Sequence, residues 1–142
     1  MANSMSGFFR QHAKQVGTIK AVVSERFLDP ETEKPYEWEL RPLTVPEEES
    51  IRRECMIPGR DKKNRITQEL DQNKYTSMSI AKSVVFPDLE SVELQDSYGA
   101  MGAEDLIKKM LLSSENIRLM KVFNRVSGID QSMEEMVDEA KD

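Results

Sequence analysis

The spacing of apolar residues changes along the chain, from a period of two near the start to a period of nearly four near the end. Apolar residues alternate with polar ones in two early runs, which is typical of β-strands with one buried face. The apolar positions are Ile19, Ala21, Val23 and Phe27 in the run 18–27, and Tyr36, Trp38 and Leu40 in the run 36–41. Later, Ala103, Leu106, Ile107 and Met110 recur at i, i+3, i+4 and i+7, as on one face of an amphipathic helix. The change predicts an α+β fold, in which an N-terminal β-hairpin or small antiparallel sheet packs on a mainly helical C-terminal half.

The two alternating runs are joined by a segment rich in turn-forming residues, 29–35, which contains Pro30 and Pro35. Such a segment between two alternating runs predicts a hairpin, which we place in residues 17–43. An isolated hairpin is only marginally stable in water, so we expect helices or further strands to cover its apolar face. Residues 1–16 show no sustained periodicity and are expected to form a flexible N-terminal arm.

A clear helix start follows the hairpin. Thr44 and Glu47 are spaced as in a capping box, in which the hydroxyl accepts from a first-turn amide and the carboxylate reaches back to the cap. We expect this helix to run to about Met56. Residues 57–70 are polar and basic, and we expect a mobile loop there, with room for a short extended piece around 66–70.

Helical signals continue beyond this loop. We expect a helix at 72–86, short helical pieces between 88 and 98, a helix with the stripe 103–110, a helix from Ser113 or Ser114 to Gly128, and a last helix after Asp130. Asp71 can cap the first of these, and Gly128 stands where a helix would end in a left-handed residue. With the hairpin, these helices are expected to form a single α+β domain of residues 17–142, of which 44–142 is mainly helical.

The sequence has no convincing catalytic set. His12 is the only histidine, so neither a histidine-centred triad nor a multi-histidine metal site can form within one chain. Cys55 is better interpreted as a buried thiol near a helix end than as a nucleophile, although Arg52 and Arg53 could lower its pKa. The G-x-x-G at 99–102 lacks flanking basic residues and is interpreted as a helix-to-helix turn. We therefore predict a protein that is not an enzyme, with no catalytic, cofactor-binding or metal-binding residues.

The formal net charge of −6 argues against nonspecific nucleic-acid binding, which depends on clustered Lys and Arg. The charge is unevenly spread, with six basic and two acidic residues from Arg52 to Arg65, and six acidic and one basic residue from Asp130 to Asp142. These regions could steer partners or subunits together, or could be two solvated surfaces. No apolar run approaches the roughly 20 residues needed to span a bilayer, and the single cysteine is consistent with a reducing compartment, so we expect a cytoplasmic protein.

Residues 84–112 hold an ordered set of apolar and acidic residues. Three pieces stand out in it, VVFPDL at 84–89, ELQDSYG at 93–99, and MGAE at 101–104 followed by the apolar positions up to Leu112. As a run of residues, this stretch resembles the XkdN-like tail assembly chaperones, small proteins of tailed phages and prophages. The resemblance extends more loosely from around Arg26 to the acidic C-terminal residues.

The resemblance implies a temporary, non-catalytic factor of tail assembly. Such a chaperone binds the long tape measure protein, keeps it soluble and helps to deliver tail tube subunits to it. It would act in the cytoplasm of the bacterial host and be absent from the mature virion. Several copies could bind along one long client, which is compatible with homo-oligomerisation, and neither nucleic acid nor a membrane is expected as a partner.

Methionines are abundant, with nine in 142 residues, and five of them lie beyond residue 100. Flexible thioether side chains adapt to irregular apolar partners, but they are also ordinary core filler. On the first interpretation, we predict that the client lies on the helices between Leu106 and Val137. The predicted contact residues are Leu106, Met110, Leu119, Met120, Phe123, Met133, Met136 and Val137.

Two other interpretations stay open at this point. A structural component of the phage tail, such as a tube or completion protein, would favour more strand than these patterns indicate. A soluble adaptor module unrelated to phages would not be encoded beside a tape measure gene, whereas a chaperone of this family would have that gene immediately downstream.

Overall fold

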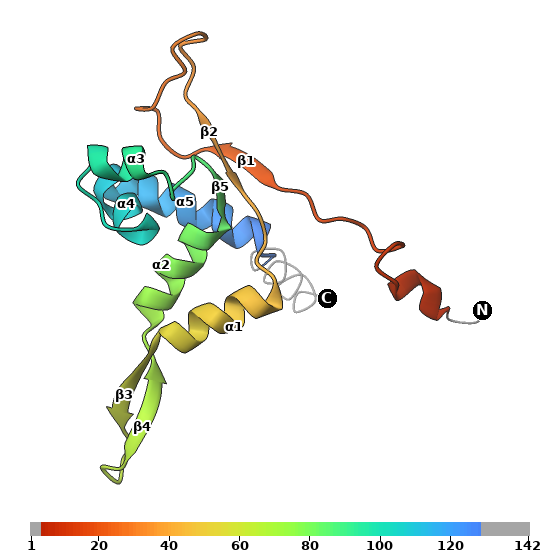
Figure 1. Cartoon of the computed structure of the whole chain (residues 1–142), viewed down its shortest axis with the longest axis vertical. Coiled ribbons are helices and arrows are strands. Elements are labelled where there is room, and N and C mark those ends of the chain that lie inside the picture. The colour runs from red at the N-terminus through yellow and green to blue at the C-terminus, as the bar shows by residue number, and fades with distance from the viewer. Residues whose placement is uncertain (1–3, 129–142) are drawn as a thin grey trace, which may run out of the picture.

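The computed structural model describes residues 4–128, which form a three-stranded sheet, a two-stranded ribbon and the helices that pack on the sheet (Figure 1). In chain order, the elements are η1 (Met5–Phe8), β1 (Ile19–Val22), β2 (Glu37–Leu40), α1 (Val45–Glu54), β3 (Met56–Arg60), β4 (Ile66–Leu70), α2 (Gln72–Ser83), β5 (Val84–Phe86), α3 (Val92–Ser97), α4 (Ala103–Met110) and α5 (Ser113–Val126). The strands of the main sheet run antiparallel in the order β1-β2-β5. This architecture confirms the predicted α+β class.

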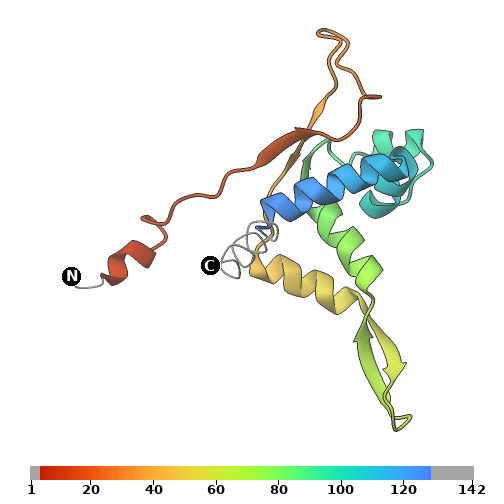
Figure 2. The same cartoon turned by 180° about the vertical axis from the view of Figure 1, so that it is seen from behind.

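The main sheet buries the face that the alternating pattern predicted. Trp38 and Leu40 are 2% and 0% exposed, and the residues next to them in β2 lie on the opposite face. Strand β1 ends at Val22, earlier than expected, because Val23 and Ser24 are both buried and two successive inward residues do not fit a strand. Figures 1 and 2 show α5 running beside the sheet, with α2 leading directly into β5.

Helix α1 begins with the predicted capping box. The Thr44 hydroxyl accepts from the Glu47 N–H at 3.4 Å, and the Glu47 carboxylate accepts from the Thr44 N–H at 3.0 Å. The Arg41 guanidinium donates to both oxygens of the same carboxylate, at 2.9 and 2.6 Å. These bonds, with Arg41 first among them, lower the pKa of Glu47 to about 2. A two-bond pair of this kind has a defined geometry, so it fixes how the chain passes from β2 into α1.

Residues 56–70 form an antiparallel ribbon, β3–β4, where we expected a mobile loop at 57–70 with a short extended piece around 66–70. The extended piece is β4, while the regular pairing with β3 was not expected. Asp61 closes the turn by accepting from the backbone N–H groups of Lys63 and Arg65, both at 2.9 Å. Gly59 lies so close to Glu69 that an added Cβ would be 2.3 Å from the Glu69 Cδ. No residue of the ribbon belongs to the core cluster of the described chain, so its strands lack the apolar alternation from which a strand is predicted.

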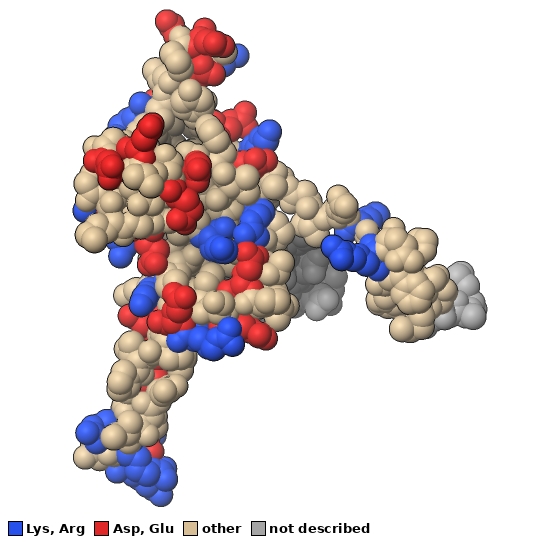
Figure 3. Space-filling view, in the orientation of Figure 1, with Lys and Arg blue, Asp and Glu red and all other residues tan. Residues whose placement is uncertain are grey.

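The ribbon carries the basic charge that the sequence concentrates in this region. It projects away from the body of the molecule, and Lys and Arg gather at its tip (Figures 1 and 3). Acidic side chains gather at the opposite end, over the loop between β1 and β2. At the tip, Arg65 pairs with Asp61 at 2.8 Å, and Lys62 and Lys63 are exposed. The basic cluster is therefore a solvated turn on a regular ribbon.

Helix α2 ends at Ser83, three residues before the expected end, and residues 84–86 pair with β2 as strand β5. Pro87 follows, and the residue before a proline favours extended backbone, which suits a strand and not a helix. The fully buried residues of α2 are Ser79, Ile80 and Ser83. Because Ser79 and Ser83 are small and polar, no pattern in the sequence indicated that this side of α2 is buried.

The remaining helix boundaries follow the predicted signals. Ser91 caps α3 by accepting from the Leu94 N–H at 3.3 Å. Gly102, with φ 98°, precedes α4, and Gly128, with φ 82°, follows α5 in the left-handed region that glycine adopts without strain. The helix predicted after Asp130 lies outside the described residues.

The expected N-terminal arm is described from residue 4 onward. Its residues are exposed through Thr18, and Figure 1 shows the arm leading away from the body. The single helical turn η1 is its regular structure, and Phe8 and Phe9 within the arm are 80% and 50% exposed. The flexibility of the arm and the single-domain organisation of 17–142 stay predictions.

One hydrophobic cluster joins the main sheet to the helices. Its buried members are Val23, Trp38, Leu40, Ile80, Leu89, Ala100, Leu106, Ile107, Met110, Leu119 and Val122. The apolar stripes of α4 and α5 face this cluster, and the exposed positions of both helices are mostly polar, with Ile117 and Met120 of α5 as apolar exceptions. Most of the apolar surface predicted on these two helices is therefore used inside the molecule.

Glu115, near the start of α5, ties this helix to the loop after β1. Arg26 donates to the two carboxylate oxygens at 3.0 and 2.6 Å, and also to the Met110 carbonyl at 2.7 Å. The Ser24 hydroxyl and, at 2.8 Å, the Leu112 N–H also donate to this carboxylate. Glu115 is 5% exposed. The hydrogen bonds from Arg26 lower the pKa of Glu115 from 4.5 to about 2, although burial opposes the shift.

We expect Glu115 to make the protein lose stability in acid. Because its pKa is lower in the folded than in the unfolded chain, its contribution is complete above about pH 5 and is lost as the pH falls toward 2. Glu115→Gln should flatten the acid limb of unfolding free energy against pH by roughly 1 kcal/mol per pH unit. Glu90→Gln, at an exposed carboxyl, should leave that limb unchanged. Urea unfolding between pH 2 and 7 measures both, and equal slopes for the two variants would contradict the assignment.

Candidate functional site

The structure places the predicted contact residues in two different environments. Leu106 and Leu119 are 0% exposed and Met110 is 6% exposed. These three side chains pack in the core, because the stripes of α4 and α5 close against the main sheet. Contact of these three residues with a client stays a prediction. Met120 is 37% exposed, and Phe123 is half-buried at the edge of the cluster. Met133, Met136 and Val137 lie outside the described residues.

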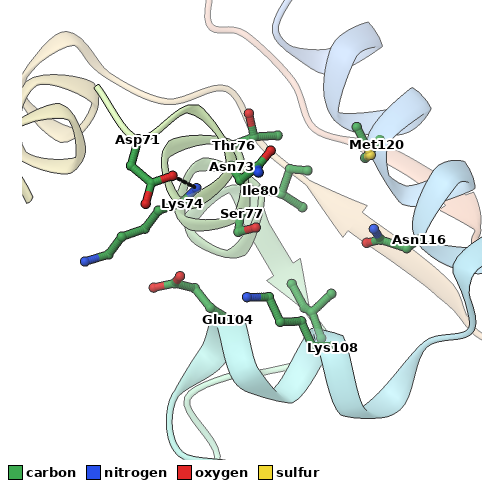
Figure 4. Close-up of a pocket in the computed structure, with 11 residues that line it drawn as sticks. Asp71, Asn73, Lys74, Thr76, Ser77, Ile80, Glu104, Lys108, Asn116 and Met120 are labelled. Atoms are coloured by element: carbon green, nitrogen blue, oxygen red, sulfur yellow. Dashed lines mark hydrogen bonds between the residues drawn. The ribbon is translucent and has the colours of Figure 1, made fainter. Parts of the chain in front are cut away.

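Met120 lies in a hollow of about 600 Å³ between α2, α4 and α5, here called the polar hollow. Figure 4 shows side chains from all three helices around it. Its apolar lining consists of Ile80, Ile107 and Met120, and its polar lining of Asp71, Asn73, Lys74, Thr76, Ser77, Glu104, Lys108 and Asn116. The hollow thus combines a small apolar floor with a border that carries charges of both signs.

Phe123 lines a second hollow of about 460 Å³, here called the apolar hollow, between α1, α2 and α5. Its other lining residues are Pro42, Leu43, Thr44, Val45, Glu48, Tyr75, Thr76, Ser79, Asn124 and Ser127. Val45 is 70% exposed although it is β-branched and apolar. Thr76 lines both hollows, so they adjoin along α2 and α5, and we call the pair the α2–α5 crevice.

The wall of the apolar hollow is held by a network between α1 and α2. The Tyr75 hydroxyl donates to the Glu48 carboxylate at 2.6 Å, and Arg52 donates to the same carboxylate at 2.6 Å. The Arg52 guanidinium also lies over the Tyr75 ring, 5.1 Å from its centroid. The bond from Tyr75, followed by the bond from Arg52, lowers the pKa of Glu48, and the same contact raises the pKa of Tyr75. The Tyr75 ring is therefore fixed as a wall of the hollow before any ligand arrives.

Ser79 adds one unsatisfied polar group to this hollow. Its side chain is buried, with the residue 3% exposed, and its Oγ has no hydrogen-bond partner among residues 4–128. A buried hydroxyl without a partner carries a desolvation cost that a neighbouring donor or acceptor would remove. Ser83, one turn along α2, donates to the Arg41 carbonyl at 2.5 Å. Ser79 therefore adds a buried hydroxyl to the wall of the hollow.

The residues that the sequence interpretation weighed as catalytic or nucleic-acid-binding candidates can be placed in the structure. Burial raises the pKa of the Cys55 thiol, the opposite of activation, and its Sγ lies 3.5 Å from the Met78 Sδ. His12 is exposed on the arm, and the G-x-x-G at 99–102 forms the turn between α3 and α4, as predicted. Within residues 4–128, no group of three or more His, Cys, Asp or Glu side chains is placed to hold a metal ion. In the same range, no helix is long and apolar enough to cross a bilayer.

Several residues of the crevice were missed by the sequence interpretation. Pro42, Leu43, Val45 and Tyr75 line the apolar hollow but lie outside the helices on which we expected the client. A signal was present in Val45, an apolar residue directly after the capping Thr44, where it faces outward from the first turn. No sequence signal pointed to Tyr75, because its position depends on how α1 and α2 pack together.

Comparisons with known proteins give the family and the fold of the chain. The family described as "Phage XkdN-like tail assembly chaperone protein, TAC" matches residues 5–141. The curated "Phage-like element PBSX protein XkdN" of Bacillus subtilis (strain 168) is 22% identical over 124 residues, which cover 87% of this chain and 83% of that protein. A crystal structure of the protein yqbn superposes with a TM-score of 0.75 at 16% identity, covering 90% of this chain and 98% of that chain. This last likeness concerns the fold alone.

Ser79→Ala should cost no stability, because it removes a buried hydroxyl that has no partner in residues 4–128. We expect an unfolding free energy that is unchanged or up to about 1 kcal/mol higher. Ser83→Ala is the matched control, and it should lower the unfolding free energy by about 1 kcal/mol because it leaves the Arg41 carbonyl without its donor. Urea unfolding of both variants checks the contrast, and a larger loss in Ser79→Ala than in Ser83→Ala would contradict it.

Substitution by alanine should lower the unfolding free energy much more at Leu119 than at the neighbouring Met120. Leu119→Ala opens a cavity at a 0% exposed position and should lower the unfolding free energy by about 2–5 kcal/mol. Met120→Ala removes a side chain that is 37% exposed and should cost less than about 1 kcal/mol. Chemical denaturation of the two variants measures the difference. Equal costs would mean that α5 does not present the faces described here.

Proposed function

Because the chain belongs to the family of phage XkdN-like tail assembly chaperones, we propose that it binds the tape measure protein during tail assembly, with the α2–α5 crevice as the contact. The family match covers nearly the whole chain and gives the coarse function, a phage tail assembly chaperone. The client and its place on the surface are our proposal. The observation that carries it is an apolar hollow with a fixed aromatic wall and an exposed Val45 at its border.

A tape measure protein is expected to be long and helical, with apolar stripes that would otherwise associate with one another. Grooves between helices recognise such segments by accepting apolar side chains spaced at i, i+3 or i+4 and i+7. The crevice runs along α5 from Asn116 to Ser127, about 16 Å of helix at 1.5 Å per residue, which matches roughly three turns of a client. It therefore offers space for a short stretch of one helix.

The two hollows would have different roles in this contact. The apolar hollow supplies the larger apolar area, and Met120 in the polar hollow supplies a side chain that adapts to varied partners. The border of the polar hollow carries Lys74 and Lys108 as well as Asp71 and Glu104, so it can pair with either sign of charge on the client. Charges at a border mainly set orientation and association rate, and contribute less to affinity.

The remaining parts of the proposal follow from the role of such a chaperone. The protein would act without catalysis in the cytoplasm of the bacterial host, would help to bring tail tube subunits to the tape measure protein and would be absent from the mature virion. Several copies would bind along one long client, since each crevice holds only a short segment. The net charge of −6 would help to keep such an assembly soluble.

Co-expression with the tape measure protein of the same phage or prophage, followed by affinity capture, tests the proposal. Val45→Glu and Met120→Glu place a charge at exposed positions of the crevice, and each should weaken the complex at least tenfold, because a buried unpaired charge costs more than about 1.4 kcal/mol. Ile117→Glu and Met101→Glu are matched controls at positions 53% and 90% exposed, on α5 and before α4, and neither lines a hollow. These controls should retain the wild-type affinity.

Three outcomes would contradict the proposal. A complex that survives both crevice variants, measured by titration calorimetry on folded protein, would remove the crevice as the contact. The absence of any complex with the tape measure protein would remove the client. Stoichiometric recovery of the protein in purified phage particles would instead identify a structural component of the tail.

A further inference from the structure

The apolar hollow lies where the chain leaves α5. Ser127 is one of its lining residues, and it caps the helix with its N–H donating to the Phe123 carbonyl at 3.0 Å. Gly128 follows with φ 82°, a left-handed residue that reverses the direction of the chain at the end of a helix. The described part of the chain therefore ends at the border of the hollow.

The sequence that follows carries an apolar stripe. In residues 129–142, Met133, Met136, Val137 and Ala140 recur at i, i+3, i+4 and i+7, and acidic residues occupy most of the other positions. Met133 is five residues beyond Gly128, which allows a separation of at most about 17 Å even when the chain is fully extended. The stripe can therefore reach the hollow without any movement of α5.

The chemistry of the hollow suits this stripe. Its walls are apolar and aromatic, contributed by residues such as Leu43, Val45, Tyr75 and Phe123, and flexible Met side chains fill irregular apolar spaces well. The Ser79 hydroxyl, buried and without a partner among residues 4–128, could donate to a thioether sulfur, which is a weak acceptor. A neighbouring segment of the same chain also has an effective concentration in the millimolar range, so even a weak contact would be largely formed.

We propose that the stripe of Met133, Met136 and Val137 occupies the apolar hollow of its own chain when no client is present, and that a client displaces it. The proposal that the stripe occupies the hollow is argued from the lining of the hollow and from the sequence of the stripe. Displacement of the stripe by a client rests on the proposed function. Covering Val45 and the neighbouring apolar surface would protect a free chaperone from associating through an exposed apolar patch.

Thiol labelling of the full-length protein tests the occupancy without any client. Val45→Cys places a thiol at the hollow, and Ile117→Cys places one elsewhere on the surface, while the native Cys55 is 0% exposed and contributes little background. If the stripe covers the hollow nine-tenths of the time, adding Met133→Ser, Met136→Ser and Val137→Ser should raise the labelling rate at position 45 about tenfold. The rate at position 117 should not change. Glu134→Gln with Glu135→Gln, which leaves the stripe intact, should leave both rates unchanged.

Two results would overturn the proposal. Equal labelling rates at position 45 with and without the three stripe substitutions would show that the stripe does not cover the hollow. Protection that disappears on dilution would show that a second copy, and not the same chain, supplies the covering segment. Circular dichroism and urea unfolding of each variant exclude loss of the fold as the cause of faster labelling.

Calorimetry with the client separates this proposal from the function on which its second half rests. The three stripe substitutions should tighten binding of the tape measure protein up to about tenfold, because they remove a competitor for the same hollow. Accelerated labelling together with no client binding would leave the occupancy in place and remove the proposed function. Alternatively, the client could bind through the crevice while the stripe substitutions change neither the labelling rate nor the affinity. That result would support the proposed function and remove the occupancy of the hollow by the stripe.

Discussion

The Glu115 carboxylate is almost sealed from water and still carries a charge. Arg26, Ser24 and the Leu112 N–H supply the hydrogen bonds that replace its hydration, and they come from both the loop after β1 and the start of α5. An ionised carboxylate at this depth is tolerated only when such partners are fixed in place, so the cluster holds α5 in one position against the sheet. Residues of α5 line both hollows, so the position of α5 sets the width of the α2–α5 crevice.

A chaperone must reconcile a stable core with apolar surface that stays available. In this protein, α4 and α5 direct their strongest apolar stripes inward, and the surface that we propose for a partner is the flank of α5 together with the first turn of α1. The Tyr75, Glu48 and Arg52 network fixes the aromatic wall in advance, which lowers the entropy lost on binding. A shallow, pre-formed crevice of this kind suits reversible binding of a client that must later be released.

Local signals in the sequence predicted local structure well. The capping box at Thr44, the cap at Asp71 and the left-handed Gly128 mark helix ends in the structure as they do in the sequence, because each depends on neighbours within a few residues. Of the β3–β4 ribbon, the sequence predicted only the extended piece at 66–70, which is β4. Strand β3 and its pairing with β4 were missed, since strands that bury neither face have no reason to alternate. The burial of Leu119 was missed for another reason, because an apolar stripe shows that a helix face is covered but not whether the chain itself or a partner covers it. The pairing of Arg26 with Glu115 joins residues far apart in the sequence and has no local signature.

The β3–β4 ribbon is held together by its own ladder and by the Asp61 turn, while its base is closed where the Asp71 N–H donates to the Cys55 carbonyl at 2.8 Å. No residue of the ribbon packs in the core cluster of the described residues. Loop tips with these properties tolerate added residues. A peptide epitope or fluorophore could accordingly be spliced between Lys62 and Lys63, giving a handle at a distance from the crevice by which assembling tails could be followed in living cells.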